Sequence, residues 1–243
     1  MRLNRYLAAC GLGSRRGCDA LIESGRVRVN GEPGQFGTQI GPADRVTVDG
    51  AEVRPHSGGV WMLHKPAGVV STARDPQGRP TVLDFVKQHG ITARLFPVGR
   101  LDRDTTGLLL LTDDGDLAFK LTHPSWGMEK EYEAEVGRAL TPAELESLQS
   151  GVDLDDGRTA PCQVQLETSA SGIVLRLVLH EGRKRQIRRM LQALAVPLLH
   201  LHRVRVGPLH LAALPPGSLR SLDAAERAAL QTARVAPAPS APA

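Results

Sequence analysis

A short polar loop near the middle of the chain carries the residue types best suited to chemistry. Its four charged residues are Arg100, Asp102, Arg103 and Asp104. Apolar stretches at 95–98 and 108–111 flank the loop, and this pattern predicts two buried strands joined by a tight turn. Such a turn is rigid enough to present a catalytic side chain, and the arginines beside it favour the ionised form of a carboxylate. The same charges are also typical of an exposed loop with surface ion pairs, so the pattern alone leaves both interpretations open.

A strand with a single tyrosine follows this loop. Residues 129–136 alternate polar with apolar or aromatic side chains, which predicts a strand with Lys130, Tyr132, Ala134 and Val136 on one side. That side is expected to face a core or a cleft. On the pattern alone, a lone tyrosine on such a strand most often packs in the core.

A third segment, residues 183–189, consists of basic and amide side chains around one apolar residue. Ile187, Met190, Leu191 and Leu194 recur at helical spacing, which predicts a helix with one apolar stripe. The basic side chains fall at the start of this helix, where the helix dipole disfavours cations, and no acids alternate with them. The cluster therefore indicates an anionic partner, and the plainer alternative is a charged outer helix face.

Together these segments resemble the motifs of the bacterial ribosomal RNA pseudouridine synthases, in the branch with a small N-terminal RNA-binding domain. The resemblance runs through residues 99–109, which read Gly-Arg-Leu-Asp-Arg-Asp-Thr-Thr-Gly-Leu-Leu, and through the Lys-x-Tyr of 130–132. It continues through the Gly-Arg-x-x-Gln-Ile-Arg of 182–188, and a Lys-Pro-x-Gly at 65–68 also matches. It covers nearly the whole chain except the final tail.

The resemblance implies an rRNA pseudouridine synthase, an isomerase that rearranges one specific uridine of small- or large-subunit ribosomal RNA without a cofactor or a metal. It implies that Asp102, and not Asp104, is the catalytic carboxylate. It also implies that Arg188 pairs with this aspartate and that Tyr132 stacks on the target base. Further substrate or RNA contacts are expected at Arg100, Lys130, Arg183, Arg185, Ile187 and Arg189.

Three details stay open at this level. Asp102 can attack either the ribose or the uracil ring, and either Tyr132 or a water can remove the C5 proton. Residues 104–107 and 201–203 look like the small-subunit enzymes, and large-subunit enzymes share much of this sequence.

The first 50 residues are predicted to form a compact basic unit. Apolar spacing and turn residues predict helices from 3 to about 11 and from 14 to 24, then strands at 26–29 and 46–48 with a hairpin turn at 30–31. Five arginines are expected to cluster at one end: Arg5, Arg15, Arg16, Arg26 and Arg28. The arrangement resembles the alpha-L RNA-binding domain, and the alternative is a charged surface on a small structural domain.

We expect an α+β architecture with a small RNA-binding domain at 1–50, a linker at 51–59, a catalytic domain at 60–234 and a disordered tail at 235–243. The catalytic domain is expected to be a mixed, mostly antiparallel sheet flanked by helices, with the cleft across the sheet. Capping residues predict helices at 81–86 and 141–150, and alternation predicts strands at 162–166, 173–180 and 198–206. In the last strand, Leu199, Leu201 and Arg203 are expected on one side. His200 and His202 share the other side, but no third ligand is near them, so no metal site is expected.

The composition permits RNA binding and argues against several other classes. The 243 residues carry a formal net charge of +4, and 25 of the 30 basic residues are arginine, whose planar fork suits phosphate and base edges. Three cysteines without a Cys-x-x-Cys pair argue against a disulfide framework or a zinc knuckle. No segment approaches the ~20 apolar residues of a membrane span. We expect a cytoplasmic monomer whose partner is ribosomal RNA, free or in pre-ribosomal particles, with no membrane partner.

Two other functions fit part of the sequence. A non-catalytic RNA-binding factor in ribosome assembly would explain the N-terminal unit and the basic helix, but not Asp102, Tyr132 and Arg188 at motif positions. A glycosidase using Asp102 and Asp104 is weaker, because two carboxylates this close in one loop lack the facing pair that such enzymes need.

Overall fold

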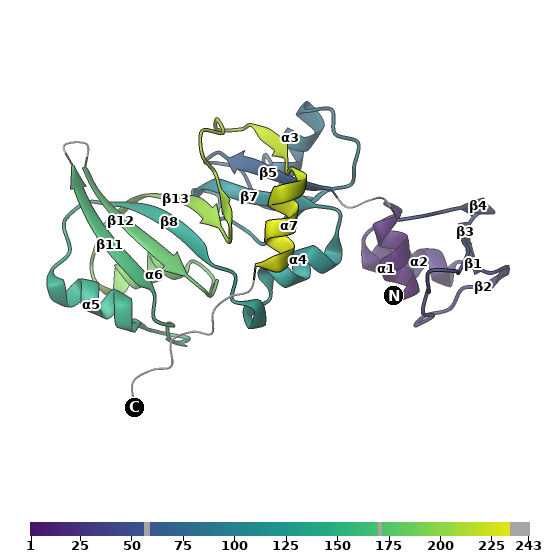
Figure 1. Ribbon diagram of the computed structural model, residues 1–243, viewed down its shortest axis with the longest axis horizontal. Coiled ribbons are helices and arrows are strands. Elements are labelled where there is room, and N and C mark those ends of the chain that lie inside the picture. The colour runs from purple at the N-terminus through teal and green to yellow at the C-terminus, as the bar shows by residue number, and fades with distance from the viewer. Residues whose placement is uncertain (56–58, 170–171, 234–243) are drawn as a thin grey trace. The chain divides into compact units, whose positions relative to one another are not determined.

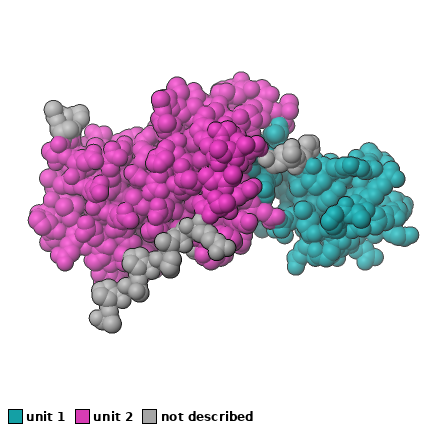
Figure 2. All heavy atoms as spheres, viewed as in Figure 1, with its two compact units in different colours: residues 1–59, 93–95, 112–115 teal, residues 60–92, 96–111, 116–243 magenta. Residues whose placement is uncertain are grey.

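The chain divides into two compact units in the computed structural model, which describes residues 1–55, 59–169 and 172–233 (Figures 1 and 2). The first unit comprises Met1–Gly59, Ala93–Leu95 and Thr112–Gly115, and the second comprises Val60–Thr92, Phe96–Leu111 and Asp116–Ala243. The centre of the predicted linker, 56–58, and the predicted disordered tail, 235–243, lie outside the described residues. The predicted domain boundaries therefore stay a prediction.

The first unit packs two helices against a small antiparallel sheet. Its elements are α1 (Leu3–Ala9), α2 (Arg15–Glu23), β1 (Val27–Val29), β2 (Glu32–Pro33), β3 (Val46–Val48) and β4 (Ala51–Glu52). The sheet order is β2-β1-β3-β4. The Ser14 hydroxyl caps α2 by accepting from the Gly17 amide at 3.0 Å, as predicted. The core forms from the apolar side of both helices, including Leu7 and Ile22, because these are the positions that the helical spacing brings together.

The turns of this sheet lead into two short strands that the sequence analysis did not predict. Asn30 and Gly31 adopt left-handed φ angles of 53° and 91° between β1 and β2, which is the conformation that an Asn-Gly hairpin requires. Asp49 and Gly50 form a second turn of this kind, with φ angles of 51° and 83°, and lead into β4. Strands β2 and β4 were not predicted, because two residues are too short to show an alternating pattern.

The second unit is built on one long mixed sheet, which confirms the α+β fold (Figure 1). Its main strands are β5 (Val60–Lys65), β7 (Thr106–Thr112), β8 (Lys130–Val136), β11 (Gln163–Ser169), β12 (Gly172–Leu179), β13 (Leu198–Val206) and β15 (Leu219–Ser221). Their order is β11-β12-β8-β13-β7-β5-β15, with β6 (Phe96–Val98) beside β7 and β14 (Leu209–His210) beside β13. The pairs β11–β12, β12–β8, β8–β13 and β5–β15 are antiparallel, whereas β13 and β7 run parallel.

Each half of this sheet packs against a hydrophobic core. In one, α5 (Pro142–Ser150) and α6 (Gln186–Ala193) cover β8, β11 and β12, and Leu148, Met190 and Leu177 are fully buried there. In the other, α4 (Gly115–Thr122) and α7 (Ala224–Thr232) pack with β5 and β7 (Figure 1). Strand β13 lies between β8 and β7, so it joins the two halves of the sheet.

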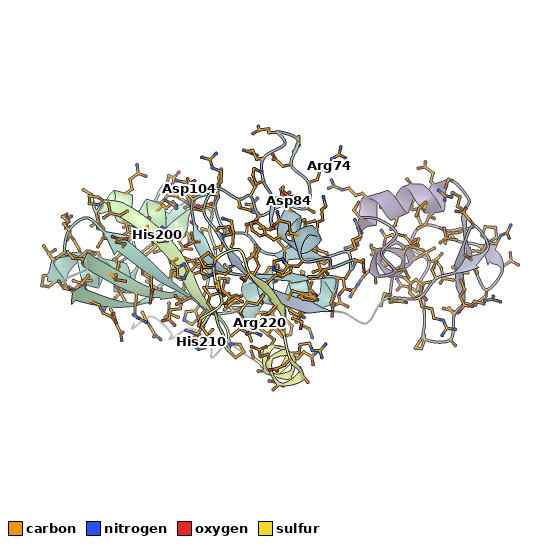
Figure 3. All side chains as sticks on the ribbon, turned by 90° about the horizontal axis from the view of Figure 1, so that it is seen from above. Arg74, Asp84, Asp104, His200, His210 and Arg220 are labelled. Carbon is orange, nitrogen blue, oxygen red and sulfur yellow. The ribbon has the colours of Figure 1, made fainter. Side chains whose placement is uncertain are left out.

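Capping residues set the helix starts as the sequence predicts. Helix α3 (Val82–Gln88) begins at a capping box between Thr81 and Asp84, whose position is marked in Figure 3. Helix α5 begins at the same arrangement between Thr141 and Glu144. In each case the side chains satisfy backbone amides that have no partner within the helix.

The parallel pairing of β7 and β13 depends on a glycine. Residue 107 faces Arg203 in the register, and a Cβ atom there would lie 2.2 Å from the carbonyl oxygen of Arg203. Gly107 also has a φ of 109°, which L side chains rarely adopt. The close approach of the two strands therefore requires glycine immediately after the polar loop.

Strand β13 also corrects a predicted side-chain face. Leu199 was expected beside Leu201, but the register shifts between Leu198 and His200, and the Leu199 side chain is 63% exposed. An irregularity of this kind breaks the two-residue period on which the prediction depends.

Candidate active site

A buried cation holds the backbone of the Asp102 loop in place. The Lys65 side chain, at the end of β5, is fully buried, and its ammonium group donates to the carbonyls of Pro66 at 2.9 Å, Arg103 at 3.1 Å and Thr105 at 2.8 Å. Burial is the main reason that the pKa of Lys65 falls to about 8. The Lys-Pro-x-Gly motif had marked this position, but the sequence did not predict its contacts.

A hydroxyl group fixes the same loop from another side. Ser71 is buried; its Oγ donates to the carbonyl of Leu101 at 2.9 Å and accepts from the Leu101 amide at 3.2 Å. Leu101 itself is buried. The residue before Asp102 is therefore fixed in both backbone and side chain, and Asp102 follows with its side chain 34% exposed.

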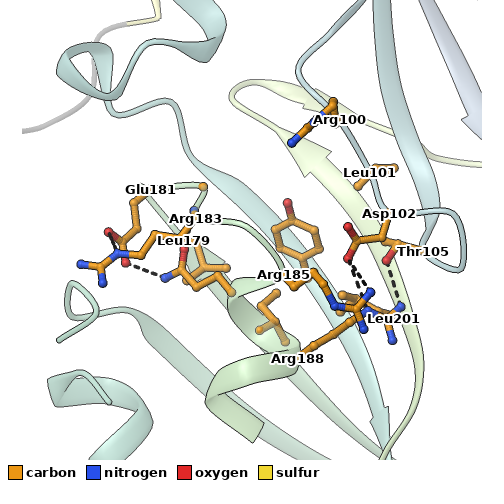
Figure 4. Close-up of a pocket in the computed structure, with 14 residues that line it drawn as sticks. Arg100, Leu101, Asp102, Thr105, Leu179, Glu181, Arg183, Arg185, Arg188 and Leu201 are labelled. Atoms are coloured by element: carbon orange, nitrogen blue, oxygen red, sulfur yellow. Dashed lines mark hydrogen bonds and ion pairs between the residues drawn. The ribbon is translucent and has the colours of Figure 1, made fainter. Parts of the chain in front are cut away.

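Two arginines from the start of α6 face the Asp102 carboxylate (Figure 4). Arg188 Nε lies 3.5 Å from Asp102 Oδ2, and Arg185 Nη1 lies 3.9 Å from the same oxygen. Arg188 also donates from Nη2 to the Thr105 hydroxyl at 3.1 Å. Its Nε is buried and makes no hydrogen bond within the described part of the chain. The guanidinium is thus fixed by Thr105 through Nη2, while its Nε faces the Asp102 carboxylate.

The arginines nearest to Asp102 in sequence have other positions than the charge pattern suggested. Arg103 pairs with Asp104 at 3.3 Å, and the Asp104 side chain is 62% exposed (Figure 3). Arg100 is exposed and lies apart from the Asp102 carboxylate (Figure 4). The positive charge beside Asp102 therefore comes from α6, which lies far along the chain and could not be inferred from the loop alone.

The basic side chains of residues 183–189 fall into two groups, and acids from other segments pair with one of these groups. Arg183 pairs with Glu181 at 3.2 Å and approaches Asp156 at 3.5 Å. Arg189 pairs with Asp155 and Asp156. These two aspartates lie between β9 (Asp153–Leu154) and β10 (Gly157–Arg158), so the structure supplies acids that the local sequence does not. The predicted RNA contacts at Arg183 and Arg189 stay a prediction, and both side chains already hold carboxylates.

Tyr132 and Ile187 line the same pocket as Asp102, Arg185 and Arg188. Beside the tyrosine lies Arg203, which the sequence analysis placed on one face of its strand but did not count among the site residues. Its guanidinium carbon is 5.9 Å from the Tyr132 ring centroid, and its Nη1 is 3.4 Å from the phenol oxygen. Arg203 Nε donates to the carbonyl of Leu108 at 2.7 Å, which fixes the guanidinium. The pocket thus places the Asp102 carboxylate, the two arginines that face it and an aromatic ring together, and Arg100, Glu181 and Arg183 also line it.

Lys130, expected to contact RNA, lies on the same strand as Tyr132. Its ammonium group donates to the carbonyl of Met128 at 2.9 Å. Burial, with a smaller contribution from nearby Arg203, lowers the pKa of Lys130 to about 8. Lys130 does not line the Asp102 pocket; it lines an adjoining hollow that shares Tyr132.

The two histidines of β13 meet a hydroxyl group. Thr106 Oγ1 lies 2.9 Å from His200 Nε2 and 2.7 Å from His202 Nδ1. Burial, reinforced by His64 and His200, lowers the pKa of His202 to about 4. Across 1–55, 59–169 and 172–233, no group of three His, Cys, Asp or Glu side chains is arranged to hold a metal ion. Within the same ranges, no helix is long and apolar enough to span a membrane.

Comparison with known proteins identifies the class to which this fold and pocket belong. Residues 59–193 match the family model of the RNA pseudouridylate synthases, and residues 1–46 match the S4 domain. The chain belongs to the RNA pseudouridylate synthase family. It is an enzyme of that class and carries an N-terminal S4 domain.

Individual relatives cover almost the full length. The chain is 39% identical over 226 residues to ribosomal large subunit pseudouridine synthase B of Bacillus subtilis (strain 168), covering 91% of each protein. It is 41% identical to an uncharacterized RNA pseudouridine synthase of Mycobacterium leprae (strain TN), covering 91% of this chain and 89% of the relative. A crystal structure of a pseudouridylate synthase superposes with a TM-score of 0.66 at 29% identity, covering 95% of this chain and 99% of that one.

Proposed function

We propose that this enzyme converts a uridine of large-subunit ribosomal RNA to pseudouridine, with Asp102 as the nucleophile. The relative from Bacillus subtilis, which matches over 91% of both chains, is named for the large ribosomal subunit. The observation that carries the proposal is the position of the Asp102 carboxylate, which faces Arg185 and Arg188 in a pocket that Tyr132 also lines.

Pseudouridine formation breaks the bond between N1 of uracil and C1′ of the ribose and joins C1′ to C5 instead. The C5 proton leaves, and N1 takes up a proton, so the reaction is an isomerisation without a net gain or loss of electrons. A charged carboxylate can begin it by attack at C1′ or at the uracil ring. Arg185 and Arg188 face the Asp102 carboxylate and hold it in place until the base is bound.

Tyr132 and Ile187 are proposed to hold the uracil ring. The target base must leave its stack to reach Asp102, and an aromatic ring compensates for the lost stacking by about 1–3 kcal/mol per base. Tyr132 lines the pocket beside Asp102, and Arg203 beneath it restricts its position. Ile187 is buried at the wall of the same pocket and offers an apolar surface to the ring.

The S4 domain is proposed to supply affinity for RNA through arginine contacts to phosphates. Arg15 and Arg16 are exposed at the start of α2. Arg28 is exposed and donates to the carbonyl of Gly31, whereas Arg26 is paired with Asp49. With Arg5, these residues are expected to give a salt-dependent, sequence-independent contribution to binding.

A comparison of two variants, each with one loop carboxylate replaced, tests the role of Asp102. The assay measures tritium release from RNA that carries uridine labelled at C5. Asp102→Asn is expected to bind the RNA as the wild type does and to release no tritium. The matched control is Asp104→Asn, because Asp104 lies two positions away and its only described ion pair is with Arg103. Tritium release by Asp102→Asn would remove this residue from the mechanism, and a wild type that binds RNA without release would favour a non-catalytic RNA-binding factor.

Mapping pseudouridines in both ribosomal RNAs of a deletion strain tests the substrate. The proposal expects one pseudouridine to disappear from the large-subunit RNA and to return with the wild-type gene. Loss from the small-subunit RNA instead would contradict the proposed substrate, and it would agree with the resemblance of residues 104–107 and 201–203 to small-subunit enzymes.

A further inference from the structure

A second hollow adjoins the Asp102 pocket. Arg100, Tyr132 and residues 181–183 line both hollows, so the two are continuous along the tyrosine. The second hollow, which we name the flanking pocket, is further lined by Lys130, Arg203, Thr122 and His123. None of the reaction steps proposed above uses this space.

The flanking pocket carries an excess of positive charge. Four of its lining residues are cations: Arg100, Lys130, Arg183 and Arg203. Its one carboxylate, Glu181, is engaged by Arg183 and by the side-chain amide of Gln186. Among the residues that the structure describes, Arg100, Lys130 and Arg203 have no carboxylate partner. Arg203 is only 4% exposed, and a buried cation without a carboxylate is costly, which favours an anionic group in this space.

The His123 ring lines this pocket, and a second aromatic ring packs against it. His123, which lines it, packs against Phe119 of α4 with the ring centroids 4.7 Å apart. Phe119 is 56% exposed, so its ring is accessible to a partner. Exposed aromatic rings beside a cationic groove are the arrangement on which unpaired bases of single-stranded RNA stack.

We propose that the flanking pocket binds the RNA nucleotide next to the target uridine. Arg100 and Lys130 receive its phosphate, and its base stacks on the pair formed by Phe119 and His123. The proposal rests on the proposed function, because it requires the target uridine in the Asp102 pocket. Since a uridine within RNA is joined to a nucleotide on each side, a pocket that continues from the first one is where a neighbour can lie. Unpaired bases that can be splayed out are the usual targets of specific RNA recognition.

Steady-state kinetics of two aromatic variants test this proposal. The probe is a short synthetic RNA that spans the uridine mapped in the deletion strain. Phe119→Ala and His123→Ala are each expected to raise KM about five-fold or more, which corresponds to the lower end of base stacking. Their kcat is expected to stay within about two-fold of the wild-type value, because neither residue touches the reacting atoms. Leu199→Ala is the control, because Leu199 is an equally exposed apolar residue at the far end of β13, beside Gly137.

Removal of the neighbouring base from the RNA provides the second measurement. An abasic site on one side of the target should raise KM for the wild type and have little further effect on Phe119→Ala, because the contact is already missing. A neutral methylphosphonate in place of that nucleotide's phosphate should likewise raise KM for the wild type and have little further effect on Lys130→Met. If the variants keep the wild-type KM, the flanking pocket does not bind this nucleotide. The same conclusion holds if the effects of the RNA change and of the protein change on KM simply multiply, whichever neighbour of the target is altered. Failure of the proposed function is distinguished because it would abolish isomerisation by the wild type, whereas here the wild type stays active.

Discussion

Lys65→Met tests whether a buried ammonium group organises the Asp102 loop. The substitution keeps the length of the side chain and removes three hydrogen bonds to the carbonyls of Pro66, Arg103 and Thr105. It also removes a charge from a fully buried position. The two effects oppose each other, and their balance changes with pH because burial lowers the pKa of Lys65 from 10.5 to about 8.

The sign of the pH effect follows from proton linkage. Below pH 8 the amine is protonated in both states, so the folded protein bears the full cost of the buried charge. Between pH 8 and 10.5 the unfolded chain still binds a proton that the folded protein has released, so the stability of the wild type rises with pH. From these two pKa values, the contribution of Lys65 to the free energy of unfolding rises by about 2–3 kcal/mol between pH 7 and pH 10.

The methionine variant lacks this contribution. At pH 7 it loses three charge-assisted hydrogen bonds, which together contribute at least about 4.5 kcal/mol, and it regains about 3 kcal/mol from the removed charge. Lys65→Met is therefore expected to be at least about 1.5 kcal/mol less stable than the wild type at pH 7. The difference is expected to widen as the pH rises to 10. Lys130, whose pKa is also near 8, is present in both proteins and cancels in the comparison.

Urea unfolding of both proteins at pH 7, 8.5 and 10, followed by circular dichroism, measures this difference. Isomerase activity of the folded variant gives a second readout, and kcat is expected to fall because the loop that holds Asp102 loses its support. A difference in stability that is constant or shrinks with pH would show that burial does not lower the pKa of Lys65 in the folded protein. The explanation of the loop would then be wrong.

Three further substitutions test other parts of the site. Gly107→Ala is expected to lower the free energy of unfolding by more than about 2 kcal/mol in urea, because its Cβ would lie 2.2 Å from a backbone oxygen of β13. Thr105→Val removes the hydrogen bond from Arg188 and should lower kcat about five-fold or more with little change in KM. Thr105→Ser keeps the hydroxyl group and should retain the wild-type kcat. Arg185→Gln should lower kcat/KM for RNA more than Arg189→Gln does, because Arg189 already holds two aspartates; equal losses would contradict this division.

Local patterns predicted what depends on neighbouring residues. The helix cap at Thr81, the capping box at Thr141 and the Asn30-Gly31 turn were confirmed, because each is determined within a few residues. The strand pair β11–β12 was also confirmed, since its two members lie close together in the sequence and alternate regularly. The family and the α+β fold followed from the resemblance and were confirmed as well.

Contacts between distant segments were beyond the sequence patterns. The acids that hold Arg189 come from the turn between β9 and β10, and no spacing rule connects the two segments. Lys65 and Arg203 are buried cations whose partners are mostly backbone carbonyls, which leave no trace in the sequence. The resemblance placed Arg188 beside Asp102, and the structure has them 3.5 Å apart, but the catalytic roles of both residues stay predictions.

The position of β13 at the centre of the sheet has a consequence for how the protein is made. Thr106 and His202, whose strands pair side by side, are separated by 96 positions, so this contact forms only after most of the chain has left the ribosome. Until then, β7 and β8 each present an open edge, and nascent chains of this length are prone to associate through such edges. We therefore expect the Asp102 pocket to assemble late in synthesis, once the segment that carries Arg185 and Arg188 has been made.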